Sequence, residues 1–278
     1  MTYYLQESDW FNSTDIPEGM NLDMLNTVEG RLSKLLSPSL KNVSTGKIVM
    51  DMGCGTGILG LQALDMGAKF VYFVERDVQM YHILKNVLSN KLDSTHYKII
   101  NKDIEELLIE DFDKGNPEVI ISEFYGPRLF DEGYVNYTKH IRSMFLNCYF
   151  IPETFKVDFY LNNIDYKLPI WPTEHDLIDH FKFMYKEKGF AKHIYTTQNL
   201  CVGSIEFNAN TQTFDNNMEF TYNGKKELLL IGVAYIKHDE LHQDYTRFGW
   251  LVDESDTGKN FRVYYDIDNY FNPRKIEV

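Results

Sequence analysis

Residues 47 to 64, KIVMDMGCGTGILGLQAL, constrain the fold of this chain more than any other stretch. An apolar run ends at Asp51, a turn with three alternating glycines follows, and a helical pattern comes next. Gly53, Gly55 and Gly57 let the backbone turn tightly and approach a ligand where side chains would clash. The first amides of the helix are then free to bind polar groups. The stretch predicts a strand, a phosphate-loop-like turn and a helix, which together begin a doubly wound α/β sheet.

Two classes of cofactor use such a turn. Gly55, Gly57 and Gly60 satisfy the GxGxxG pattern of dinucleotide sites, whereas the longer pattern DxGxGxG, which begins at Asp51, resembles motif I of the class I methyltransferases. This resemblance implies S-adenosyl-L-methionine as the cofactor. The next apolar run, FVYFV, ends at Glu75, about the distance at which doubly wound folds place an acid on ribose hydroxyls. We therefore expect Glu75 to bind the ribose.

The first half of the chain alternates apolar runs with helical segments, as parallel sheets do. Residues 1 to 19 carry aromatic residues among polar ones and are interpreted as an arm or lid. An amphipathic helix is expected over 20–36, because Pro38 forbids its continuation much further. The later elements are expected as strands at 70–74, 96–100 and 118–122, helices at 78–88 and 134–148, and a helical turn at 104–109.

The pattern changes towards a period of two beyond Pro152. Six runs there are rich in β-branched and aromatic residues, with turn signals between them, at 155–161, 201–209, 218–222, 227–236, 247–252 and 261–267. They predict an antiparallel, β-barrel-like domain. The expected organisation is an N-terminal arm at 1–19, a Rossmann-like cofactor domain at 20–151, and the barrel-like domain at 152–278 with a helical arm near 165–188.

The overall charge limits the partners of the protein. The chain has 278 residues with 28 basic and 41 acidic side chains, a formal charge of −13. Such a surface opposes binding to nucleic acid and to anionic membranes, and it attracts cationic substrates. The three cysteines have no metal-like spacing, the amino terminus is too polar for a signal peptide, and no apolar run approaches ~20 residues. We expect a cytoplasmic protein.

A second constellation of acids narrows the substrate. Glu123 stands at the carboxyl end of the strand EVIIS, and Glu132 follows nine residues later. The segment SEFYGPRLFDEGY resembles the double-glutamate hairpin of the protein arginine methyltransferases, with Ser-Glu, an aromatic residue, Gly and a second Glu at the same spacing. The resemblance extends over most of residues 20 to 150. It implies Glu123 and Glu132 as catalytic residues and a protein nitrogen as the methyl acceptor.

The chemistry explains why two carboxylates would be needed. A guanidinium with a pKa above ~12 has no free lone pair, but two carboxylates can bind its N–H donors and draw positive charge away from the attacking nitrogen. The methyl group then moves in line from a sulfonium. Most of the rate would come from alignment in a dry pocket, with the carboxylates stabilising the cationic transition state.

The same resemblance implies roles for further residues. Arg31 falls where the family offers an arginine to the methionine carboxylate of the cofactor. Glu105, which follows Ile104, matches the acid that meets the adenine amino group, whereas Asp103 occupies the position used by many other class I methyltransferases; one of the two acids is expected to serve. Met24 or Leu25 matches an apolar residue that borders the target arginine.

Several positions depart from the family pattern. The aromatic YFxxY signature is not recovered, Phe124 and Tyr125 replace the usual Trp and Met, and Tyr134 stands near the family's pocket methionine. The THW loop is present only as FGW at 248–250, which keeps Trp250 without the histidine. Methylation of a small molecule or another side chain, and a non-catalytic cofactor-binding role, therefore remain alternatives. A nicotinamide dehydrogenase is the most distant one.

Two further expectations concern metals and assembly. HDELH at 238–242 approaches a zinc motif, but it stands at the end of a strand pattern and no distant third ligand is evident, so no metal site is expected. Members of the resembled family dimerise through an arm, for which 165–188 is the candidate here. A homodimer is expected.

Overall fold

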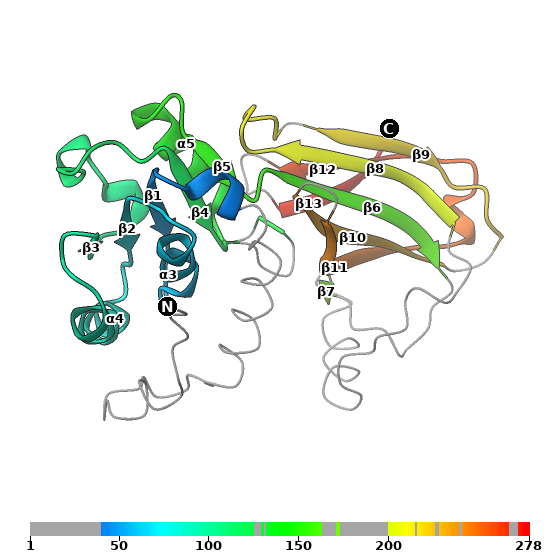
Figure 1. Ribbon diagram of the computed structural model, residues 1–278. Helices are drawn as coiled ribbons and strands as arrows, with labels where there is room; N and C mark the ends of the chain where they lie inside the picture. Colours follow the sequence, from blue (N-terminus) through cyan, green and yellow to red (C-terminus); the bar gives the residue numbers. More distant parts are fainter. Residues whose placement is uncertain are drawn as a thin grey trace. The chain divides into compact units, whose positions relative to one another are not determined.

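The computed structural model describes residues 40–124, 129–130, 132–162, 171–172, 200–214, 216–225, 228–238, 241–266 and 272–278. The chain divides into two compact units, whose elements are labelled in Figure 1. The first unit holds the described residues up to Phe124 together with Asn136–Glu153 and the ends of His238–Leu241. The second unit holds the described parts of Tyr125–Val135, Thr154–Lys237 and His242–Val278.

The first unit is built on a five-stranded parallel sheet with the strand order β3-β2-β1-β4-β5 (Figure 1). Its strands are β1 (Ile48–Met52), β2 (Phe70–Val74), β3 (Tyr97–Ile100), β4 (Val119–Ser122) and β5 (Tyr149–Ile151). From β1 the chain proceeds through β2 to β3 on one side, and then crosses to β4 and β5 on the other. The order reverses between β1 and β4, and open α/β sheets bind ligands beyond the carboxyl ends of the strands at such a point.

The central strands form from continuous apolar runs. Every residue of β1, β2 and β4 is buried, whereas only Ile100 is buried in the edge strand β3. Parallel strands covered on both faces have this pattern because neither face meets water. Burial of these side chains places the core of the first unit in and around the middle of its sheet.

Helices connect and cover the parallel strands. α3 (Ile58–Asp65) follows β1, α4 (Val78–Lys91) follows β2, and α5 (Tyr134–Met144) precedes β5 (Figure 1). Asp77 caps α4, because its side chain accepts a hydrogen bond from the N–H of Met80 at 2.8 Å. The expected strands and the expected helices after β1 and β2 are confirmed to within a few residues, and α4 extends three residues beyond its predicted end.

Two expectations for the first unit were wrong in detail. The helix expected to reach Cys148 ends at Met144, because the Arg142 guanidinium bonds the carbonyl oxygens of Leu146 at 2.8 Å and Cys148 at 2.6 Å and so holds a turn. The strand β5 follows, too short for its own periodicity to be seen. The helical turn expected at 104–109 consists of two 3₁₀ turns, η1 (Ile104–Glu106) and η2 (Ile109–Asp111).

The second unit contains two antiparallel-rich sheets (Figure 1). The larger has the order β7-β11-β10-β6-β8 and the smaller β13-β12-β9. Their strands are β6 (Thr154–Asn162), β7 (Trp171–Pro172), β8 (Leu200–Asn208), β9 (Asn217–Thr221), β10 (Leu228–His238), β11 (Leu241–Val252), β12 (Asn260–Asp266) and β13 (Asn272–Glu277). The period-two pattern is confirmed, since burial alternates along β9 and β12. Closure of the two sheets into a barrel stays a prediction.

Three findings refine the expectations for this half of the chain. β13 was not predicted, because its sequence NPRKIE is polar and lies at the edge of the smaller sheet. β7 pairs in parallel with β11 inside the segment expected to be helical. The N-terminal arm at 1–19, the helix at 20–36 and most of the arm at 165–188 lie outside the described residues.

An aromatic core fills the second unit. The ring of Phe130 is its centre, with Phe207 at 4.9 Å, Tyr265 at 5.3 Å and Phe155 at 5.4 Å between ring centroids, all in edge-to-face contact. Such pairs contribute about 0.5–1.5 kcal/mol beyond the area they bury. The segment that carries Glu132 is therefore anchored in the second unit by a residue two positions before it.

Candidate active site

The glycine turn joins β1 to α3 across the end of β2. The N–H of Cys54 bonds the carbonyl oxygen of Val74 at 2.9 Å, which ties the turn to the last residue of β2. Gly57, with φ of 76°, is the cap of α3, and a Cβ there would lie 2.6 Å from Leu84 Cδ1. A Cβ on Gly53, with φ of 68°, would lie 2.0 Å from the Phe124 ring. Both positions therefore require glycine for conformation and for space.

Asp51 supports the turn by a hydrogen bond to the start of α3. Its side chain is 2% exposed, and Oδ2 accepts a hydrogen bond from the N–H of Gly60 at 2.7 Å. A carboxylate at the start of a helix satisfies one of the unpaired amides and is stabilised by the helix dipole. A Cβ on Gly60 would lie 2.3 Å from the Phe73 ring, so this glycine permits close packing of α3 on β2. Asp51 lies within the predicted site as a support for the turn.

Glu75 connects the end of β2 to the glycine turn. Its side chain is buried, Oε2 accepts a hydrogen bond from the N–H of Gly55 at 2.9 Å, and Oε1 accepts one from the N–H of Asp77 at 2.8 Å. The amide side chain of Asn101 donates to the Glu75 carbonyl oxygen at 2.8 Å. Each carboxylate oxygen has two lone pairs, so Glu75 can accept further hydrogen bonds while both amides stay bound. The acid is held in position before any ligand arrives.

The acids after β3 have different surroundings. Asp103 Oδ1 accepts a hydrogen bond from the N–H of Glu105 at 3.1 Å, and Oδ2 pairs with Arg76 Nη1 at 3.1 Å. Ile104 between them is buried and anchors the turn η1, whereas Glu105 is exposed. Asp103 is therefore committed to the cap and to Arg76. Glu105 is the acid of the two that faces outward.

Tyr137 and Arg76 lie near these acids and were not predicted from the sequence. The ring of Tyr137, on α5, lies 5.0 Å from that of Phe124, which in turn covers Gly53. Burial raises the pKa of Tyr137, and the charge of Asp103 adds to this while that of Arg76 opposes it. Arg76 could have been noticed because it directly follows Glu75, but nothing in a single sequence marks Tyr137. The phenol stays neutral at physiological pH.

The structure places the two expected catalytic acids in different units. Glu123 follows β4 directly and belongs to the first unit at the carboxyl end of the parallel sheet, where it is partly buried. Glu132 is exposed and belongs to the second unit. Leu129, three residues before Glu132, is fully buried with φ of 78°. A left-handed conformation is costly for leucine, at ~1–3 kcal/mol, and persists only where its surroundings impose it.

Other predicted positions have the following places. Tyr134 is fully buried and stacks on Phe130 with ring centroids 6.1 Å apart, and Trp250, in β11, is 2% exposed. Arg31, Met24 and Leu25 lie outside the described residues, as does Tyr125. Trp250 and Tyr134 are thus core residues of the second unit.

The apparent zinc motif is part of a strand hairpin. His238 ends β10 and His242 lies in β11, so the two histidines are not one turn apart on a helix. Among the residues that the structure describes, no group of three or more histidine, cysteine or acidic side chains is arranged to hold a metal. Within that same part of the chain, no helix is long and apolar enough to span a bilayer.

A parallel sheet whose strand order reverses beside a glycine turn, with acids after β2 and β3, is a Rossmann-like fold, and it is similar to the fold expected from the resemblance to class I methyltransferases. The family described as ribosomal protein L11 methyltransferase (PrmA) matches residues 23–123. A structure of PRMT6 with SAH superposes with a TM-score of 0.62 at 15% identity, covering 92% of this chain and 99% of that one.

Within that class, the chain resembles the protein arginine methyltransferases. The probable protein arginine N-methyltransferase 6.1 of Oryza sativa subsp. indica is 39% identical over 87 residues, which cover 31% of this chain and 22% of the relative. Protein arginine N-methyltransferase 1 of Dictyostelium discoideum is 30% identical over 138 residues, which cover 50% of this chain and 38% of the relative. The matched segments thus span less than half the length of these relatives.

Proposed function

We propose that the chain is an S-adenosylmethionine-dependent methyltransferase that methylates arginine, or a related nitrogen, on a protein. The observation that carries the proposal is the hydrogen bond between Glu75 and Gly55, 2.9 Å from Oε2 to N, because it joins the acid expected to bind the ribose to the glycine turn at the carboxyl ends of β1 and β2. The resemblance to arginine methyltransferases along the first half supports the choice of acceptor.

The cofactor would be held by residues of the first unit. The backbone of the turn at Gly53, Gly55 and Gly57 would bind the methionine end, and Glu75 would accept hydrogen bonds from the ribose hydroxyls. Glu105, with Ile104, would bind the adenine amino group. Asp51 supports the turn, and Arg31 is assigned to the methionine carboxylate by resemblance. When bound, the cofactor supplies an electrophilic methyl group on a sulfonium.

The acceptor nitrogen would be prepared by Glu123 and Glu132. Two carboxylates would bind the paired N–H donors of a guanidinium and stabilise its positive charge. The remaining nitrogen would then bond to the methyl carbon as the bond from that carbon to the sulfonium breaks, which releases S-adenosylhomocysteine, and the nitrogen would lose one proton to a carboxylate or to water. Phe124, whose ring covers Gly53, excludes water from the methionine end. The formal charge of −13 favours a basic protein as substrate.

The proposed assembly is a cytoplasmic homodimer formed through residues 165–188. One observation supports assembly in general: the related structure of Trypanosoma brucei PRMT1, with a TM-score of 0.58 at 16% identity over 88% of this chain and 87% of that one, is an enzyme–prozyme heterotetramer. A monomeric mass in solution scattering at micromolar concentration would contradict the dimer.

A methylation assay tests this function. Incubation with S-adenosylmethionine and an arginine-rich protein should add ~14 Da per methyl group on arginine, and Glu123→Gln should lower the rate about 10²- to 10³-fold, because a charge-stabilising group is lost. Glu118→Gln is the control, since this acid precedes the same strand and pairs with Lys47 at the surface. Modification of another residue type, or of small molecules only, would favour the alternative acceptors. Full activity of Glu123→Gln would contradict the catalytic assignment.

A further inference from the structure

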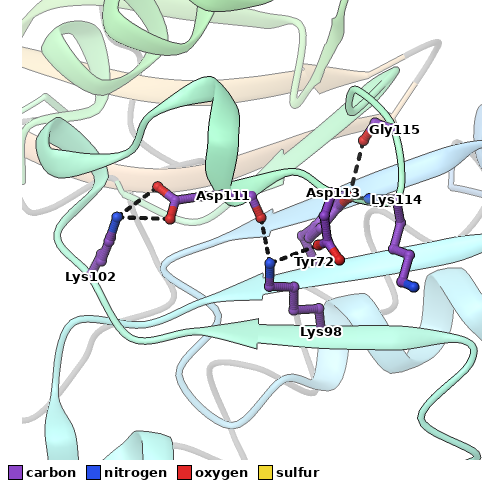
Figure 2. A network of polar contacts seen from close by, with 7 residues as sticks. All are labelled: Tyr72, Lys98, Lys102, Asp111, Asp113, Lys114 and Gly115. Carbon is purple, nitrogen blue, oxygen red and sulfur yellow. Dashed lines mark hydrogen bonds and ion pairs between the residues drawn. The ribbon is translucent and has the colours of Figure 1, made fainter.

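The connection between β3 and β4 is held together by a network of polar contacts (Figure 2). This connection carries Asp103 and Glu105 near its start and contains both 3₁₀ turns, η1 and η2. Leu107, between the turns, is fully buried, and its carbonyl oxygen lies 3.2 Å from Nε2 of His140 on α5. The connection is thus fixed to the body of the unit at Leu107, between its two 3₁₀ turns.

Lys102 and Asp111 join the two ends of the segment that contains both 3₁₀ turns. Lys102 Nζ lies 2.7 Å from Oδ1 and 2.8 Å from Oδ2 of Asp111, as Figure 2 shows. Asp111 Oδ2 also accepts a hydrogen bond from the N–H of Leu108 at 2.9 Å. The Asp111 side chain is 18% exposed and that of Lys102 is 37% exposed, so this pair is better shielded from water than an ordinary surface pair. The ion pair closes a ring of ten residues that contains both turns.

A second contact holds the same connection farther from the acids. Lys98 Nζ, on β3, bonds the Asp111 carbonyl oxygen at 2.8 Å and Asp113 Oδ1 at 2.7 Å (Figure 2). Tyr72 accepts from the N–H of Lys114 at 2.7 Å and donates to the Gly115 carbonyl oxygen at 3.1 Å. These contacts fix the exit of the connection to the sheet, whereas only the pair at Lys102 reaches back to the residue that precedes Asp103.

We propose that Lys102 and Asp111 are positioning residues that set the affinity for the cofactor by fixing Glu105 at the adenine, without touching the cofactor themselves. This inference rests on the proposed function. The cap by Asp103 sets the conformation of η1, and Lys102, its immediate neighbour, sets where η1 begins. If the ring opens, the cofactor must order the turn as it binds, and that cost appears as lost affinity.

The pair could instead act through charge or through stability alone, and these roles have different signatures. Loss of a positive charge beside an acidic segment would favour the cationic S-adenosylmethionine over the neutral S-adenosylhomocysteine. Loss of positioning weakens both ligands by the same factor, because they share the adenosine. General destabilisation lowers the melting temperature, and any loss of affinity is then the same for substitutions elsewhere in the network as for one at Lys102.

Calorimetry with both ligands, on the full chain, tests the proposal. We expect Lys102→Met to weaken both about tenfold, equal to ~1.4 kcal/mol, and Lys102→Arg to restore most of the affinity. Lys98→Met is the matched control, because it removes contacts to the same aspartate residue but not the ring closure. It should lower the melting temperature and leave the affinity near that of the wild type.

Each other outcome overturns the inference. Equal weakening by Lys98→Met and Lys102→Met would assign the effect to general stability, and tighter binding of S-adenosylmethionine alone would assign it to charge. If Lys102→Met does not fold, Asp111→Asn replaces it, because the amide oxygen still accepts from Leu108 while the charge is lost. If the wild type binds both ligands and Lys102→Met binds them with the same affinity, this inference alone is wrong. A wild type that binds neither ligand defeats the proposed function as well.

Discussion

The donor side and the acceptor side of the proposed site are built in different ways. On the donor side, Asp51, Gly55 and Glu75 belong to one unit, where Glu75 accepts a hydrogen bond from the N–H of Gly55 and Asp51 accepts one from the N–H at the start of α3. On the acceptor side, Glu123 belongs to the first unit and Glu132 to the second, with a strained leucine and an aromatic anchor in the intervening segment. The donor residues are thus held by contacts within one unit, whereas Glu132, proposed for the acceptor, belongs to a segment that is anchored in the aromatic core of the second unit.

The largest expected effect is that of Phe130→Ala, which should impair the acceptor side and spare the donor side. Phe130→Ala removes the centre of the aromatic core and should lower the free energy of unfolding by about 3–5 kcal/mol, as for other buried aromatics. Because this residue anchors the segment of Glu132, methyl transfer should fall while calorimetry still detects S-adenosylhomocysteine.

Phe220→Ala supplies the control for that comparison. Phe220 is also buried in the second unit, where it packs on Phe261 with ring centroids 5.5 Å apart, but it is not part of the acceptor segment. Its loss should destabilise the protein and affect transfer less than Phe130→Ala does. If both substitutions lower methyl transfer equally at a temperature where both proteins are folded, Phe130 does not anchor the segment that carries Glu132.

The next effect concerns the donor side. Gly57→Ala should cost ~1–3 kcal/mol in stability and should weaken cofactor binding, because the left-handed backbone and the nearby Leu84 both oppose a Cβ. Gly46→Ala has a similar φ of 72° with no atom within 4 Å of the added Cβ. The difference between the two melting temperatures, from thermal unfolding, measures the packing contribution alone. Identical unfolding and binding in both variants would contradict the packing of the turn.

The smallest effect is a pH dependence from Asp111. Burial alone would raise its pKa, but the hydrogen bonds from Lys102 and from the Leu108 amide hold the pKa below the ordinary value. A depressed pKa in the folded state means that ionised Asp111 stabilises the fold above its unfolded pKa of ~3.9 and that this contribution disappears as the pH falls through the folded value.

Thermal unfolding between pH 2 and 5, a range of ~1–2 units around that pKa, measures this dependence. The melting temperature of the wild type should fall more steeply with acid than that of Lys102→Met, in which the pair is absent. Parallel curves for the two proteins would show that the pair does not stabilise the folded state.

The sequence was most informative where the structure is local. The glycine turn, the acid at Glu75 and the apolar parallel strands follow from spacing and burial over fewer than about 30 residues, the scale of one βαβ unit. The division of Glu123 and Glu132 between units could not be predicted, because it depends on Phe130 contacting residues as distant as Tyr265. The polar edge strand β13 could not be predicted for the same reason. It is a strand because it pairs with β12, and its own sequence has no strand pattern.

The central claim is that the first unit binds the adenosyl cofactor through Glu75 and the glycine turn. Calorimetry of the wild-type chain and of Glu75→Gln, with S-adenosylhomocysteine and with NAD, tests it most directly. We expect the wild type to bind S-adenosylhomocysteine and not NAD, and Glu75→Gln to bind it about 10- to 100-fold more weakly, since hydrogen bonds to a charged group are lost. Binding of NAD in its place, or equal affinity in both proteins, would contradict the account.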